Sequence, residues 1–141
     1  MVSIRTLRRD RHLKVFLIAG ESSGDAYGAE LIRSLKETCR AKGWTLEAVG
    51  WGGDLMIDAG MKGLKHQSSI NFMGFWEVAK HLPSILANLK QAEKDVVREH
   101  PDVLVTIDFP GFNMRLAKRL RITNHSSFRL QWVAPQIWAW K

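Results

Sequence analysis

A short apolar run near the start of the chain constrains the fold more than any other feature of the sequence. Five apolar residues, Val15 to Ala19, follow one another without polar alternation, and Gly20 ends the run. A continuous run of this kind predicts a strand covered on both faces, as in a parallel sheet. The stretch PDVLVTIDF, residues 101–109, has the same character. Both stretches therefore predict strands of a sheet that has helices on its two faces.

Helical patterns alternate with the expected strands. Leu31, Ile32, Leu35 and Cys39 recur at helical spacing, and Gly43 closes that helix. Further along, the expected elements are a strand (TLEAVGWGG), a short helix (DLMIDAG), a strand (KGLKH), a long helical stretch (residues 72–100), a strand (DVLVTIDF), a basic helix (NMRLAKRLR) and a last strand (FRLQWVAP). Pro83 is expected to break the long helix, with Ser84 as the N-cap of its second part. That part is expected to bury one apolar face, made of Ile85, Leu86, Leu89, Val96 and Val97.

This alternation predicts an α/β fold, a Rossmann-like doubly wound parallel sheet with right-handed crossovers. The sheet is expected in residues 13–141, behind a flexible basic arm in residues 1–12. In such a sheet the first and fourth strands lie side by side, and ligands bind beyond their carboxyl ends. The turn AGESSGD and the loop DFPGFN are therefore expected to converge.

Charge and length limit the function classes. The chain has 141 residues, a net charge of +7 and no acidic residue from Phe109 to Lys141. This asymmetry favours an anionic partner (nucleic acid, a phosphorylated ligand or an anionic membrane), and a solvated basic face is the alternative. No stretch approaches the ~20 apolar residues of a spanning helix. We expect a cytoplasmic protein with a membrane-surface association.

The turn AGESSGD does not match a phosphate-binding loop. Its glycines are spaced by four and no lysine follows, so both the dinucleotide fingerprint and the P-loop fail. The carboxylates of Glu21 and Asp25, beside Ser22 and Ser23, suit sugar hydroxyl groups better than phosphate. The alternative is an N-cap at Ser22 or Ser23, with Asp25 complementing the helix dipole.

The loop after the fourth strand carries Asp108. Desolvation at the end of a buried strand would raise the pKa of Asp108 toward the range of a general base. The alternative is a carboxylate that accepts hydrogen bonds from its own turn. For Asn113, an N-cap of the basic helix is favoured over ligand binding.

Two apolar segments remain. Residues 72–89 hold Phe72, Phe75, Trp76 and Leu82, which suit a helix lying in a membrane interface, and core packing is the alternative. The tryptophans of WAW, Trp138 among them, would line a cleft or stack on a sugar. The histidines are scattered, so no metal site is expected.

Several motifs together resemble the lipid-A-disaccharide synthase family. In chain order they are AGESSGD, GGDLM, FMGFWEV, PDVLVTIDFPGFN, RLAK and APQIWAW. The resemblance implies the N-terminal, acceptor-side domain of a GT-B glycosyltransferase, whose C-terminal donor domain is absent from this chain. We therefore expect no turnover from the chain alone.

The resemblance also implies a reaction. An inverting hexosyltransferase of this family joins UDP-2,3-diacylglucosamine to 2,3-diacylglucosamine 1-phosphate, releases UDP and forms the β-1,6 disaccharide of lipid A. It uses no metal or other cofactor and acts peripherally at the inner membrane of Gram-negative bacteria, on an anionic surface. Oligomeric state stays open, with a homo-oligomer among the alternatives.

By the same resemblance, Asp108 is the catalytic base, and Gly111 stands where many relatives have a second aspartate. Substrate contacts are implied for Glu21, Ser22, Ser23, Gly24, Asp25, Met73, Gly74, Asn113 and Trp138. Membrane or acyl contacts are implied for Phe72, Phe75, Trp76 and Leu82.

Two rival classes stay open. One is a non-catalytic lipid- or membrane-binding module that retains only the acceptor domain. The other is a basic nucleic-acid-binding domain, which lacks any recognisable recognition motif, so nucleic acid is not the expected partner.

Overall fold

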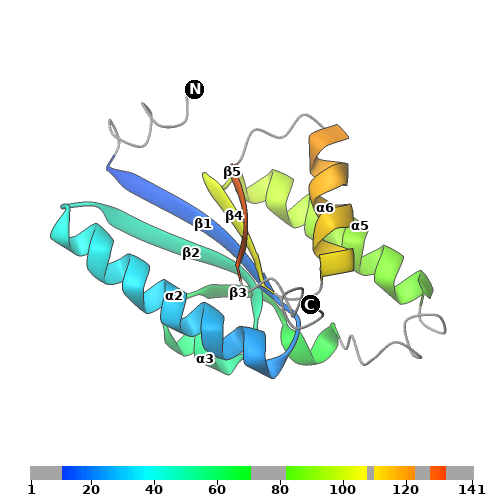
Figure 1. Ribbon diagram of the computed structural model, residues 1–141, viewed down its shortest axis with the longest axis horizontal. Coiled ribbons are helices and arrows are strands. Elements are labelled where there is room, and N and C mark those ends of the chain that lie inside the picture. The colour runs from blue at the N-terminus through cyan, green and yellow to red at the C-terminus, as the bar shows by residue number, and fades with distance from the viewer. Residues whose placement is uncertain (1–10, 71–81, 108–109, 123–127, 133–141) are drawn as a thin grey trace, which may run out of the picture.

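One five-stranded sheet lies between two layers of helices in the computed structural model, which describes residues 11–70, 82–107, 110–122 and 128–132 (Figure 1). In chain order the elements are β1 (His12–Ala19), α2 (Ser22–Ala41), β2 (Thr45–Gly52), α3 (Asp54–Asp58), β3 (Lys62–His66), the 3-10 helix η1 (Gln67–Ser69), α5 (Leu82–Glu99), β4 (Val103–Ile107), α6 (Pro110–Ile122) and β5 (Phe128–Trp132). Neighbouring strands all pair in parallel, in the order β3-β2-β1-β4-β5. The predicted Rossmann-like doubly wound sheet is confirmed. Its first strand begins at His12, the last residue assigned to the arm.

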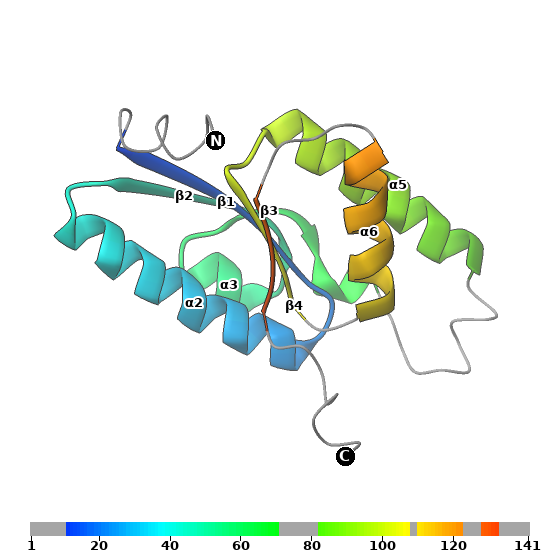
Figure 2. The ribbon, with the colours of Figure 1, turned by 45° about the horizontal axis from the view of Figure 1, so that its top comes forward.

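The helices divide between the two faces of the sheet. Helices α2 and α3 cover one face, and α5 and α6 cover the other (Figures 1 and 2). Alternate residues of β1 supply both cores, since Val15 and Leu17 pack under α2 whereas Phe16 and Ile18 pack under α5 and α6. Burial on both faces explains why the first strand reads as a continuous apolar run.

The helices do not begin where the sequence predicts. Helix α2 begins at Ser22 with Glu21 at the N-cap position, so neither serine is the N-cap. Helix α5 begins at Leu82, before Ser84, and α6 begins at Pro110, which places Asn113 inside the helix. The three predicted N-caps are therefore wrong. Proline lacks an N–H that the first turn of a helix leaves unpaired in any case, so Pro83 and Pro110 are tolerated near these starts.

The predicted apolar face of α5 is only partly right. Leu89 and Val96 are buried, but Leu86 and Val97 are exposed. The buried stripe instead includes the polar residues Asn88 and Asp95, together with Ala92. These residues follow the helical period, and their hydrogen bonds to other elements make burial of the polar pair tolerable.

Glycines end two helices, and the stop at Gly43 is as predicted. Gly43 follows α2 with φ of 72°, and Gly60 follows α3 with φ of 113°. Both values lie in the region that favours glycine over residues with a Cβ atom. Cys39, one of the residues that recur at helical spacing, is buried in α2, and burial raises the pKa of its thiol. Among the helices of the described segments, none is long and apolar enough to cross a bilayer.

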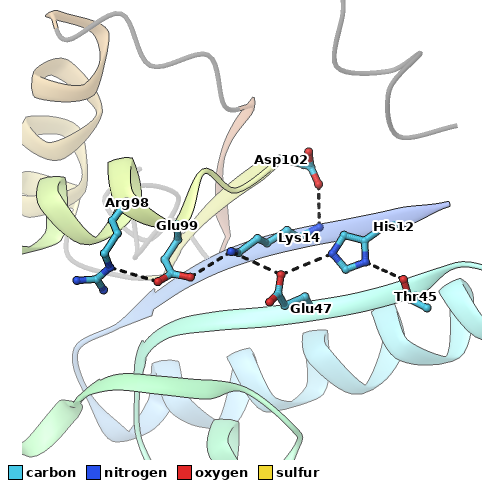
Figure 3. A network of polar contacts seen from close by, with 7 residues as sticks. All are labelled: His12, Lys14, Thr45, Glu47, Arg98, Glu99 and Asp102. Carbon is cyan, nitrogen blue, oxygen red and sulfur yellow. Dashed lines mark hydrogen bonds and ion pairs between the residues drawn. The ribbon is translucent and has the colours of Figure 1, made fainter. Parts of the chain in front are cut away.

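A chain of charged and polar side chains joins β1, β2 and the α5–β4 connection (Figure 3). Lys14 Nζ lies 3.1 Å from Glu99 Oε1 and 3.5 Å from Glu47 Oε2. The backbone N–H of Lys14 donates to Asp102 at 2.8 Å, and Asp102 returns a backbone hydrogen bond to the Lys14 carbonyl at 2.9 Å. These contacts lie where the strands begin, so they stabilise the edge opposite the ligand-binding edge expected for this fold.

Candidate active site

The carboxyl ends of β1 and β4 lie side by side, as the sequence predicts. Ala19, the last residue of β1, pairs with Ile107, the last residue of β4. The turn that leads to α2 and the segment that leads to α6 therefore start from neighbouring strand ends. Two further segments leave the same edge, since Gly52 at the end of β2 pairs with His66 at the end of β3. Adjacent parallel strand ends of this kind form the ligand-binding edge of doubly wound sheets.

The turn after β1 presents polar groups at the surface. Glu21, Ser22 and Ser23 are all exposed, and the Ser23 hydroxyl lies 3.1 Å from Glu21 Oε1, to which it donates. Asp25 donates its backbone N–H to the Glu21 carbonyl at 2.9 Å, which closes the first turn of α2. The Glu21 side chain makes no capping hydrogen bond to α2. Its other carboxylate oxygen can therefore accept a hydrogen bond from a ligand hydroxyl.

Asp25 differs from its neighbours because it is buried, with 4% of its surface exposed. Its Oδ1 accepts backbone hydrogen bonds from Gly53 at 2.9 Å and Met56 at 3.0 Å, and its Oδ2 accepts one from Leu55 at 3.1 Å. From the sequence, Asp25 is expected to face sugar hydroxyl groups, with a charge at the start of its own helix as the alternative. In the fold, the carboxylate also sits at the N-terminus of α3, where unpaired N–H groups and the helix dipole favour an anion.

Only some of the sequence-predicted site residues fall within the described part of the chain. Gly24 is buried beside Asp25, Asn113 is buried inside α6, and Leu82 is the first residue of α5. The remaining predicted residues lie outside the described residues: Phe72, Met73, Gly74, Phe75, Trp76, Asp108 and Trp138. Asp108 follows Ile107 directly in the sequence, and α6 begins two residues later.

A polar group after β3 was not anticipated from the sequence. His66 Nδ1 accepts the Ser68 backbone N–H at 3.2 Å and lies 2.8 Å from the Ser68 hydroxyl. This leaves Nε2 as the protonated nitrogen, which donates to Asp54 Oδ1 at 2.9 Å. Next to it, Gln67 Oε1 is buried and accepts no hydrogen bond from the residues that the structure describes. The signal that could have found His66 and Gln67 is their position at the carboxyl end of a strand of the parallel sheet.

The arrangement can recognise hydroxyl groups. Exposed carboxylate and hydroxyl oxygens at the edge give acceptors and donors of the kind that a sugar needs. Across the described ranges, no three His, Cys, Asp or Glu side chains gather as metal ligands would.

Comparison with known proteins assigns the family. A family model described as lipid-A-disaccharide synthetase matches residues 15–141. The lipid-A-disaccharide synthase of Paramagnetospirillum magneticum is 39% identical over 127 residues, which are 90% of this chain and 32% of that protein. That of Chromohalobacter salexigens is 36% identical over 129 residues, 92% of this chain and 32% of the protein.

This chain belongs to the lipid-A-disaccharide synthase family. The resemblance seen in the sequence motifs is thereby confirmed. The chain spans about a third of the length of the curated relatives it matches; for the synthase of Trichlorobacter lovleyi the share is 33%. A family match that begins at Val15, in β1, takes in every described strand and helix from that point onward.

Proposed function

We propose that this chain is the acceptor-binding domain of a GT-B glycosyltransferase of lipid A biosynthesis. The donor would be UDP-2,3-diacylglucosamine and the acceptor 2,3-diacylglucosamine 1-phosphate, joined to the β-1,6 disaccharide with release of UDP. The observation that carries the proposal is the pairing of Ala19 with Ile107, in a chain that belongs to this family. Because of that pairing, the turn that carries Glu21 and the segment that carries Asp108 follow adjacent strand ends.

In the proposed reaction an acceptor hydroxyl loses its proton as its oxygen attacks the anomeric carbon of the donor. The C–O bond to UDP breaks on the opposite face of the sugar, which inverts the anomeric configuration. We assign the general base to Asp108, because a carboxylate at the end of a buried strand fits this task. Glu21, held by Ser23, would accept a hydrogen bond from a second acceptor hydroxyl.

A membrane-facing role is supported by the outer surface of α5 and α6. Leu86 and Met114 are exposed there, at 45% and 68% of their surface. Six exposed cations share these helices: Lys90, Lys94, Arg98, Arg115, Lys118 and Arg121. Apolar residues beside cations favour contact with anionic lipid headgroups. This observation equally supports the second candidate function, a lipid-binding module without catalysis.

A turnover assay on the complete gene product separates the two candidates. Both lipid sugars are supplied, and mass spectrometry follows the disaccharide and UDP. The glycosyltransferase proposal expects both products, in equal amounts. Binding of the acceptor lipid without any disaccharide would favour the binding module instead. We expect the 141-residue chain by itself to give no turnover, because it spans about a third of the relatives' length.

A further inference from the structure

The buried carboxylate of Asp25 joins two segments that leave the carboxyl edge of the sheet. It belongs to the first turns of α2. In the described part of the chain, the carboxylate accepts three hydrogen bonds, all from the backbone of residues 53–56 at the start of α3. We propose that Asp25 is a positioning residue, which holds the Glu21 turn in place through the N-terminus of α3 without itself binding the acceptor sugar. This inference rests on the proposed function.

Helix α3 depends on this carboxylate for its cap. The helix has only five residues, and its own N-cap residue, Gly53, has no side chain to pair the first N–H groups. Asp25 supplies the acceptor from another element, 28 residues away in the sequence. A charged acceptor makes these hydrogen bonds stronger than neutral ones. These hydrogen bonds therefore hold the start of α3 to the start of α2.

Gly53 allows this contact because it has no side chain. A Cβ atom on Gly53 would lie 2.4 Å from Asp25 Oδ2 and 2.8 Å from Gln67 Cδ. Only a residue without a side chain lets the carboxylate and the Gln67 amide approach the backbone this closely. The segments after β1, β2 and β3 thus meet at one point, beside the Glu21 turn.

The same turn of α2 carries the proposed acceptor contacts. The N–H of Asp25 donates to the carbonyl of Glu21 at 2.9 Å, so a shift of Asp25 is passed directly to Glu21. The Asp25 carboxylate, at 4% exposure and with both oxygens engaged, is poorly placed to accept a hydrogen bond from a ligand. We therefore expect Asp25 to affect acceptor binding by positioning Glu21.

The test compares Asp25→Asn with Asp95→Asn in the complete gene product. Asp95 is a matched control because it is equally buried, at 3%, and accepts hydrogen bonds from Trp51 and Gln91 on the other face of the sheet. In Asp25→Asn, the side-chain amide nitrogen would stand in place of Oδ2 and face the Leu55 N–H. Both groups are hydrogen-bond donors, so this hydrogen bond would be lost. We expect the N–H of Leu55 to exchange at least about tenfold faster. The KM for the acceptor should rise about tenfold or more, since small displacements of a positioned group have large effects.

The outcomes are distinct. Asp95→Asn should lower the melting temperature and leave the acceptor KM unchanged. Faster exchange at residues 53–56 in Asp25→Asn with an unchanged KM and kcat would overturn the positioning role. A raised KM without faster exchange would make Asp25 a direct ligand, which also overturns it. Absence of disaccharide formation by the wild-type protein would instead overturn the proposed function.

A measurement on the wild type covers the case in which Asp25→Asn does not fold. Acceptor lipid is added, and exchange of the Gly53, Leu55 and Met56 N–H groups is followed. Positioning through α3 predicts slower exchange at all three when the acceptor is bound, because a ligand stabilises the state that it binds. Unchanged exchange at acceptor saturation would overturn the inference.

Discussion

The indole Nε1 of Trp51 donates a 2.9 Å hydrogen bond to Asp95 Oδ2 across the interface between β2 and α5. Trp51 is fully buried and Asp95 is 3% exposed. Asp95 Oδ1 also accepts from Gln91 at 2.8 Å and lies 3.2 Å from Arg98. A buried carboxylate is stable only with such partners, so this pair holds α5 in one place on the sheet.

Loss of that hydrogen bond should destabilise the fold. Trp51→Phe removes the donor and leaves a cavity, which should lower the free energy of unfolding by about 2 to 4 kcal/mol. Urea unfolding measures this difference. Trp44→Phe is the control, since Trp44 is only half-buried and should change much less. Equal effects of the two substitutions would contradict the role given to the Trp51–Asp95 contact.

Glu99 should make stability depend on pH. The hydrogen bond from Lys14 holds the pKa of Glu99 below its usual range, against the opposing effect of burial. A folded-state pKa below the unfolded one means that this stabilisation is fully present above the usual glutamate pKa of about 4.3. It is lost as the pH falls from there through the lowered folded-state value.

Glu99→Gln should therefore lower stability at neutral pH and flatten this acid dependence. Denaturant unfolding at several pH values between about 2 and 7 would measure it. Glu30→Gln removes the same charge from an exposed position on α2 and serves as the control. An unchanged pH profile in Glu99→Gln would show that the Lys14 contact does not stabilise the ionised carboxylate.

Two glycines should differ in their tolerance of a methyl group. A Cβ atom on Gly50 would clash with the carbonyl oxygen of Leu17 on the neighbouring strand. A Cβ atom on Gly43 would meet nothing within 4 Å among the described residues other than its chain neighbours. Gly50→Ala should lower the free energy of unfolding by more than about 4 kcal/mol or prevent folding. Gly43→Ala should lower it by about 1 kcal/mol, because only the cost of the left-handed backbone conformation applies there. Comparable losses would show that β1 and β2 separate easily.

Asp108→Asn tests the general base. In the complete gene product, kcat should fall by about 100- to 10,000-fold, because amide nitrogen cannot take the hydroxyl proton. The melting temperature and the affinity for the acceptor should change little. Near wild-type kcat would remove Asp108 from the base role and leave it a carboxylate that pairs with its own turn.

Trp76→Glu tests the apolar segment of residues 72–89. A carboxylate in a membrane-contacting segment should weaken binding to anionic phospholipid vesicles, measured by co-sedimentation. Tyr27→Glu is the control, since Tyr27 is an exposed aromatic residue on α2. Equal vesicle binding by wild type and Trp76→Glu, with normal folding, would exclude this segment from membrane contact.

Local patterns predicted most of the fold but not the helix starts. KGLKH, a short run with two lysines, is β3 over Lys62–His66, as predicted. Ser22, Ser84 and Asn113 are good capping residues by type, yet none caps a helix. Capping preference is worth only about 1 kcal/mol, so packing of the whole helix against the sheet decides where it starts.

The sequence by itself determined the order of strands and helices, the glycine stops and the neighbouring ends of β1 and β4, because these follow from periodicity, backbone preference and the handedness of crossovers. Only the tertiary structure decided that Asp25 caps α3 and that Trp51 binds Asp95. These partners are 28 and 44 residues apart. A hydrogen bond over such a separation leaves no periodic signal in the chain, and it exists only once the sheet has brought the two elements together.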